Sequence, residues 1–190
     1  TIRVGTTGGG AKDSIDPHNA VGYPDIARVF ALYDPLAMRN ANYEYELLLA
    51  EEISGNAAAD LWTIRLKKGL TFHNGKTVTA DDVIFSIRRI IDPKAPKVGA
   101  AGLADVDPNG MKKLDDRTVA VQLKRPFAIF DEQIGQYFNG IVPPFVLASE
   151  EAVIRFVAST PGAIGYVPAC LVDRRVSVIL QLEGGPACPR

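Results

Sequence analysis

The stretch that decides the fold is LWTIRLKKGLTFHNGKTVTADDVIFS, residues 61–86. Its first six residues alternate in the manner of a strand, which places Trp62, Ile64 and Leu66 on one face and the residues between them on the other. An Asn-Gly pair follows between two further strand-like runs, and it is the preferred two-residue hairpin turn because both central positions need positive φ. The stretch therefore predicts a strand and then a hairpin that turns at residues 74–75.

A helix is predicted directly after this hairpin. The Thr79 hydroxyl can accept a hydrogen bond from a free backbone N–H, and Asp81 and Asp82 stand at the positive end of the helix dipole. One apolar stripe then recurs at helical spacing, and Asp92-Pro93 ends it. The stripe consists of Val83, Ile87, Ile90 and Ile91.

The remaining patterns indicate a chain in which strands and helices interleave. A loop rich in Gly, Ala and Pro is expected after the helix as far as Gly110. Further strands are predicted at residues 2–6, 118–123, 163–167 and 174–182, and further helices at residues 25–36, 127–138 and 146–158. The fold class expected from this order is α/β or α+β with a mixed sheet, and α/β is the favoured one.

Composition excludes several classes of protein. The 190 residues are 47% hydrophobic and 23% charged, which is a globular mixture, and 21 Lys and Arg balance 22 Asp and Glu. This balance is not that of a nucleic-acid-binding protein. No apolar run reaches the roughly 18 residues that a membrane-spanning helix needs, and residues 1–5 do not resemble a signal peptide. The chain is therefore expected to be cytosolic or a mature secreted protein without its leader.

No catalytic, cofactor or metal site is predicted. His18 and His73 have no partner residues that suggest a triad, and the glycine run matches neither nucleotide-binding fingerprint. Asp81 and Asp82 are explained by their position at a helix start. Cys170 and Cys188 can form a disulfide or remain two thiols, and neither has a second Cys or a His at zinc-ligand spacing.

The best candidate for ligand binding is the glycine-rich turn after the first strand. Glycines free the backbone to turn tightly or to approach a ligand closely, and a purely structural turn is favoured over a turn that faces a ligand cleft. Aromatic side chains near this turn in sequence can supply flat apolar surface to a ligand. The candidate ligand-binding residues are Thr7, Gly8, Gly9, Gly10, Tyr23 and Tyr33.

Residues 61–86 also strongly resemble the family-5 extracellular solute-binding proteins, the dipeptide, oligopeptide and nickel binders of ABC importers. The family pattern is an aromatic strand, then R-x-G-hydrophobic-x-F-H-x-G, then T-A-x-D-V and a helix, and this chain keeps nearly all of it. The resemblance extends more loosely over residues 1–148. It includes residues 14–17, 33–36, 125–127 and 141–143.

The resemblance implies one lobe of a type-II periplasmic-binding-protein fold, expected over residues 1–148, with residues 149–190 as a return segment that completes the lobe. It implies a non-enzymatic periplasmic or extracellular protein that closes on a peptide-like solute and delivers it to an ABC permease. It also implies that the glycine-rich turn faces the ligand cleft. Residues 158–167 are similar to a strand of the phosphate- and oxyanion-binding proteins, so a truncated or chimeric chain is expected.

A single lobe is expected to bind its solute weakly, because closure of two lobes normally buries most of the ligand surface. A homodimer can replace the missing wall. The alternative function is a non-binding structural or designed scaffold fragment, and a hydrolase that uses Asp81 or Asp82 is a third, less favoured one.

Overall fold

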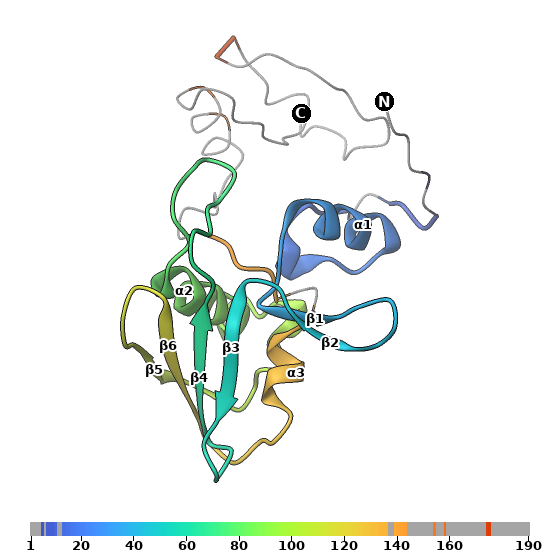
Figure 1. Cartoon of the computed structure of the whole chain (residues 1–190). Helices are drawn as coiled ribbons and strands as arrows, with labels where there is room; N and C mark the ends of the chain where they lie inside the picture. Colours follow the sequence, from blue (N-terminus) through green and yellow to red (C-terminus); the bar gives the residue numbers. More distant parts are fainter. Residues whose placement is uncertain are drawn as a thin grey trace.

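The predicted strand at residues 61–66 is confirmed as β4 (Leu61–Leu66) in the computed structural model, which describes residues 5, 7–10, 13–136, 139–143, 154, 158 and 174–175. Trp62, Ile64 and Leu66 are buried, whereas Leu61 is exposed. The strand lies inside a four-stranded antiparallel sheet of order β3-β4-β6-β5 (Figure 1). The other strands of this sheet are β3 (Ala50–Gly55), β5 (Val106–Lys113) and β6 (Thr118–Leu123).

Helix α2 (Ala80–Ile90) packs on this sheet through the predicted apolar stripe. Val83, Ile87 and Ile90 are almost fully buried, in one core cluster with the inward residues of β4 and β6. The helix begins with a capping box, in which the carboxylate of Asp82 accepts hydrogen bonds from the Thr79 N–H and hydroxyl at 2.8 Å each. The local sequence therefore specifies both the start of α2 and the face that it buries.

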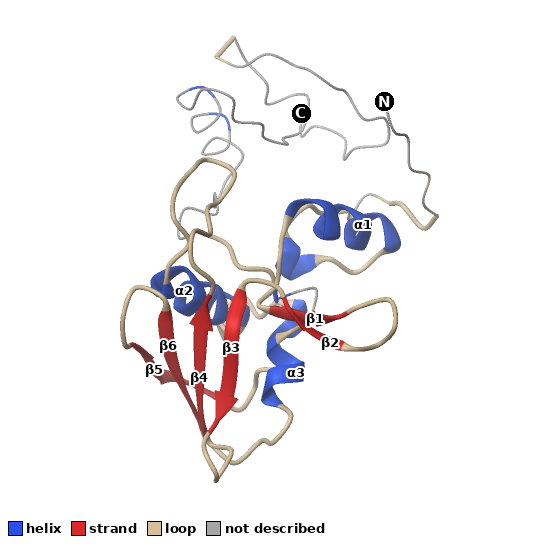
Figure 2. Ribbon diagram, viewed as in Figure 1, coloured by secondary structure: helices blue, strands red, loops and turns tan. Residues whose placement is uncertain are grey.

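The other helices and the smaller sheet lie beside the β3 edge of the large sheet (Figure 2). Strands β1 (Ala37–Arg39) and β2 (Tyr45–Leu47) form a two-stranded antiparallel sheet. Helix α3 (Phe130–Ile134) contacts β1, while α1 (Tyr23–Leu32) lies on the far side of β1 from the large sheet. Short 3-10 turns occur at Pro17–Asn19 and Val98–Ala100.

The predicted two-residue hairpin turn is wrong in its geometry. Gly75 has φ +81°, but Asn74 is not in the positive region, and the Gly75 N–H donates to the Phe72 carbonyl at 2.8 Å. The hairpin therefore has a three-residue loop whose last residue, Gly75, adopts the left-handed backbone conformation. Thr71 and Thr77 pair across it in a single antiparallel β-bridge. The chain reverses where expected without forming two strands there.

Three further expectations need correction. The loop expected to extend to Gly110 ends earlier, because β5 begins at Val106; a register shift lets this edge strand hold Pro108 and Gly110. Of the helix expected over residues 127–138, the described residues 127–136 form only the five-residue α3. The sheet predicted as mixed is antiparallel in each pairing of the described residues. The two cysteines lie outside the described residues, as do the first strand except residue 5, the helix at residues 146–158 except residues 154 and 158, and the C-terminal strands except residues 174–175.

Candidate functional site

Most of the predicted ligand-binding residues gather at the start of α1. The glycine loop (residues 7–10) is exposed, and Gly8 has φ +86°, which favours glycine. A Cβ placed on Gly22 would lie 3.6 Å from the Gly8 carbonyl oxygen, and one on Gly9 would lie 3.8 Å from Cγ of Pro24. The loop and the first turn of α1 are therefore neighbours. Tyr23 is 72% exposed beside them.

Tyr33 does not belong to this group. It follows the last residue of α1, about 15 Å from the helix start at 1.5 Å of rise per residue. Its side chain is half-buried, and a Cβ on Gly140 would lie 3.2 Å from its Cβ. Burial raises the pKa of its phenol, and the negative charge of Asp16 raises it further. The structure thus places Tyr33 at a buried polar cluster rather than beside the glycine loop.

This cluster is centred on His18, which is fully buried. Arg89 of α2 donates from its two terminal nitrogens to the carboxylate of Asp16 at 2.8 and 2.6 Å. One of these nitrogens also lies 2.6 Å from His18 Nδ1, and His18 Nε2 lies 2.8 Å from the Gly140 carbonyl. Because a guanidinium only donates, Nδ1 accepts and the proton resides on Nε2. The neutral imidazole joins three segments that are distant in sequence.

The surroundings of His18 favour its neutral form. Burial and the charge of Arg89 together lower its pKa to about 4, against the opposing effects of the Gly140 carbonyl and the Asp16 carboxylate. The pKa of Asp16 is lowered, because its hydrogen bonds and charge pairing with Arg89, together with its bond from the His18 N–H, outweigh the opposing desolvation. The sequence analysis assigned His18 no partner residues and missed this cluster. No local sequence pattern connects His18 with Arg89 and Gly140, which lie 71 and 122 positions away in the chain.

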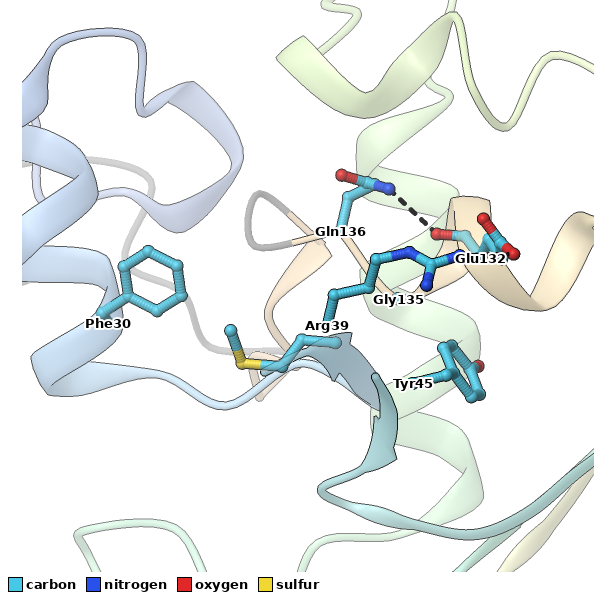
Figure 3. A pocket seen from close by; sticks show the side chains of 7 residues that line it. Phe30, Arg39, Tyr45, Glu132, Gly135 and Gln136 are labelled. Carbon is cyan, nitrogen blue, oxygen red and sulfur yellow. Dashed lines mark hydrogen bonds and ion pairs between the residues drawn. The ribbon is translucent and has the colours of Figure 1, made fainter. Parts of the chain in front are cut away.

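A separate small cavity of about 170 Å³ lies between α1, β1, β2 and α3 (Figure 3). Its charged groups are already paired, since Arg39 and Glu132 lie 2.7 Å apart. Burial and the nearby carboxylates of Asp131 and Glu132 raise the pKa of Tyr45 to about 12. Ligand pockets usually measure roughly 300–1,000 Å³. At about 170 Å³ the cavity is therefore too small for a peptide. It contains no residue of the glycine loop, because it is lined by Phe30, Met38, Arg39, Tyr45, Glu132, Gly135 and Gln136.

The carboxylate pair at the start of α2 has structural partners. Asp82 is fully buried and bonded to Thr79 and Lys76, whereas Asp81 forms an ion pair with Lys113 at 2.8 Å. Across the described part of the chain, no group of three or more His, Cys, Asp or Glu residues is placed to hold a metal ion. Likewise, none of the helices described there is both long and apolar enough to cross a bilayer.

Comparison with known proteins identifies the fold and the family. The family profile described as "Bacterial extracellular solute-binding proteins, family 5 Middle" matches residues 44–162, which contain the whole four-stranded sheet and α2. The chain belongs to the family-5 bacterial extracellular solute-binding proteins. This confirms the resemblance carried by residues 61–86, and the members found by comparison are named as binding proteins rather than enzymes.

Individual family relatives support this assignment. The Escherichia coli periplasmic murein peptide-binding protein MppA is 30% identical over 132 residues, which are 62% of this chain and 24% of MppA. Haemophilus influenzae OppA in complex with a nonapeptide superimposes with a TM-score of 0.64 at 23% identity, over 79% of this chain and 31% of OppA. The binding protein AgaA from A. tumefaciens, in complex with agropinic acid, has a TM-score of 0.65 at 24% identity, over 81% of this chain and 30% of AgaA.

The structural neighbours are type-II periplasmic binding proteins, which confirms the predicted fold class as part of a lobe of that fold. The chain spans between about a quarter and a third of the length of these three relatives. The division into a lobe at residues 1–148 and a return segment at residues 149–190 stays a prediction. The roles of the glycine loop, Tyr23 and Tyr33 in binding a ligand are likewise still predictions.

Proposed function

We propose that this chain is the part of a periplasmic or extracellular binding protein that forms one wall of its ligand site, and that the whole protein captures a peptide-like solute for an ABC permease. The observation that carries the proposal is the family match over residues 44–162 together with a relative, 30% identical, that is named as a murein peptide-binding protein. No enzymatic activity is proposed, since the carboxylates of α2 have structural partners.

The ligand-contacting surface that we propose is the rim, which comprises the glycine loop, Val21 and Tyr23. Val21 and Tyr23 are 76% and 72% exposed, so large apolar side chains stand free next to backbone groups that a ligand can reach. A tyrosine offers an apolar ring and a hydroxyl at low entropic cost, and glycines let a peptide backbone approach closely. Tyr33 is assigned instead to the support of the buried cluster, which leaves Thr7, Gly8, Gly9, Gly10 and Tyr23 as proposed contacts.

One wall alone supports only weak binding. A dissociation constant of about 1 μM corresponds to about −8 kcal/mol, and a wall that supplies half of that free energy gives a dissociation constant of about 1 mM. We therefore expect this 190-residue chain, as a monomer, to bind short peptides in the millimolar range. Sub-micromolar binding by a verified monomer would contradict this one-wall picture.

The test is an NMR titration of the isotope-labelled chain with trialanine and with a mixed tripeptide library. We expect peptide to shift the amide signals of the rim, and we expect Tyr23→Ser to weaken the apparent affinity several-fold. Tyr43→Ser is the matched control, because Tyr43 is 80% exposed but lies in the β1–β2 turn. Equal effects of the two substitutions would refute the proposed surface.

The same titration separates the other possibilities. If no peptide shifts any signal, the chain is the non-binding fragment considered above. If a small acidic solute shifts the rim and tripeptides do not, the ligand class is wrong while the surface is right. Native mass spectrometry of the titrated sample then reports stoichiometry, and a peptide-dependent dimer would show that a second copy supplies the opposite wall.

A further inference from the structure

The three glycines of the glycine loop have no side chains that could anchor them. Gly8 and Gly10 have open space where a Cβ would stand, and both are exposed. A flexible loop loses conformational entropy when a ligand orders it, and this loss weakens binding. A loop that binds well must therefore be held from elsewhere, and the structure shows a set of contacts that does so.

The first contact is a pair of hydrogen bonds between Gly10 and Asp13. The Gly10 N–H donates to Asp13 Oδ1 at 2.8 Å, and the Asp13 N–H donates to the Gly10 carbonyl at 3.0 Å. The second oxygen of Asp13 faces α1, where both terminal nitrogens of Arg28 lie 3.3 Å from it. Arg28 thus connects the C-terminal end of the glycine loop to the helix.

The second contact is the carboxylate of Asp25, which is only 3% exposed. Its Oδ1 accepts from the Ser14 N–H at 2.7 Å and from Arg28 at 3.2 Å. Its Oδ2 lies 3.4 Å from the backbone nitrogens of both Val21 and Gly22. One buried carboxylate therefore connects the segment after the glycine loop with the segment that carries the exposed Val21.

We infer that Asp25 and Arg28 are positioning residues for the ligand, because together they hold the glycine loop and the start of α1 in one arrangement. We call Asp13, Asp25 and Arg28 the clamp. This inference rests on the proposed function, since it concerns the same rim. Arg28 suits the role because its planar fork contacts two carboxylates at once, which a lysine ammonium does less well.

The test compares Arg28→Ala, Arg28→Lys and Arg65→Ala in the whole 190-residue chain. Arg65 is the matched control, because it also bridges two carboxylates, those of Glu51 and Glu52 at 3.2 and 2.7 Å, but on the large sheet. Amide hydrogen exchange is measured for Gly10 and Ser14, and trialanine affinity by NMR titration. Thermal unfolding reports any global destabilisation.

In Arg28→Ala we expect exchange at Gly10 and Ser14 to be about tenfold faster, the change expected for losing one charge-assisted hydrogen bond. Affinity for trialanine should fall by a similar factor, while exchange in the large sheet stays unchanged. Arg28→Lys should restore part of both effects, and Arg65→Ala should alter neither.

Unchanged exchange and affinity in Arg28→Ala would overturn the inference. So would faster exchange throughout the chain, because it would show a general structural role. If the unsubstituted chain binds no tripeptide, the proposed function fails and the clamp has no ligand to position. The exchange rates still decide in that case whether the clamp holds the loop, so the two failures are distinguishable.

Discussion

The buried His18 predicts that acid destabilises this protein well above the pH at which carboxylates titrate. Its pKa of about 4 lies below the ordinary value of 6.5 because of burial and the neighbouring Arg89. When the pH falls below 6.5, His18 becomes protonated in the unfolded chain but stays neutral in the folded chain, so the free energy of unfolding decreases. The loss begins near pH 6.5 and is complete below about pH 4. Protonation would place N–H on Nδ1, facing the Arg89 guanidinium at 2.6 Å.

The size of this effect follows from the two pKa values. Relative to pH 8, the loss of unfolding free energy from His18 is about 1 kcal/mol at pH 5.5 and about 2–3 kcal/mol at pH 4.5. Urea unfolding at these three pH values measures it, with fluorescence of the single tryptophan as the probe. That residue, Trp62, is 6% exposed in the folded core.

The controls use the fact that the sequence contains only two histidines. His18→Gln removes the titrating group, so the stability difference between pH 8 and pH 4.5 should shrink by the amount above, whatever its effect on stability at pH 8. His73→Gln is the matched variant; His73 is exposed on the loop after β4, and the full pH dependence should persist in it. An unchanged pH dependence in His18→Gln, or an NMR titration of His18 near pH 6.5, would refute the reasoning.

Three substitutions away from the rim test the packing described above, each by urea unfolding at pH 8. Ile87→Ala opens a cavity between α2 and the sheet, and should cost about 2–5 kcal/mol. Ser86→Ala removes the hydroxyl that accepts from the buried Val142 N–H at 2.9 Å, and should cost about 1–3 kcal/mol. Gly110→Ala would place a Cβ 2.6 Å from that of Gln122, and should cost about 1–3 kcal/mol through forced shifts in β5.

Each of these substitutions has an exposed counterpart of the same type. Val98→Ala and Ser54→Ala remove side-chain atoms on the surface, and Gly10→Ala adds a Cβ with nothing within 4 Å of it. All three should change stability by less than about 0.5 kcal/mol. A counterpart that costs as much as its buried partner would show that the assignment of the core is wrong.

The parts of the fold that the sequence predicted are those governed by short-range periodicity. The alternation in β4 and the stripe in α2 each bury one face, so a pattern visible within a few residues decides their structure. Strand β5 escaped prediction because Pro108 and Gly110 normally interrupt a strand, and only its position at the sheet edge with a register shift tolerates them. The hairpin after β4 differs from the predicted two-residue turn because its loop contains three residues.

The candidate site divides in the same way. The exposed glycine loop and Tyr23 are neighbours partly because they are close in sequence, and grouping them required little more than that. The role of His18 depends on partners 71 and 122 positions away, which no local pattern connects to it. Tyr33 was grouped with the loop on sequence distance alone, whereas the length of α1 separates the two.

Two separate sets of contacts hold the rim in position. The clamp fixes the glycine loop against α1, while the pair of Asp16 with Arg89, together with His18 and Gly140, fixes residues 16–18 against α2. Because the two sets share no residue, their effects should be separable. Loss of Arg28 should change amide exchange in the glycine loop and peptide affinity, but not the pH dependence of stability. Loss of His18 should change the pH dependence of stability, but not amide exchange in the loop or peptide affinity. If both variants changed both properties, the N-terminal segment would unfold as one unit with the sheet, and the preorganisation of the rim would be a consequence of global stability rather than of the clamp.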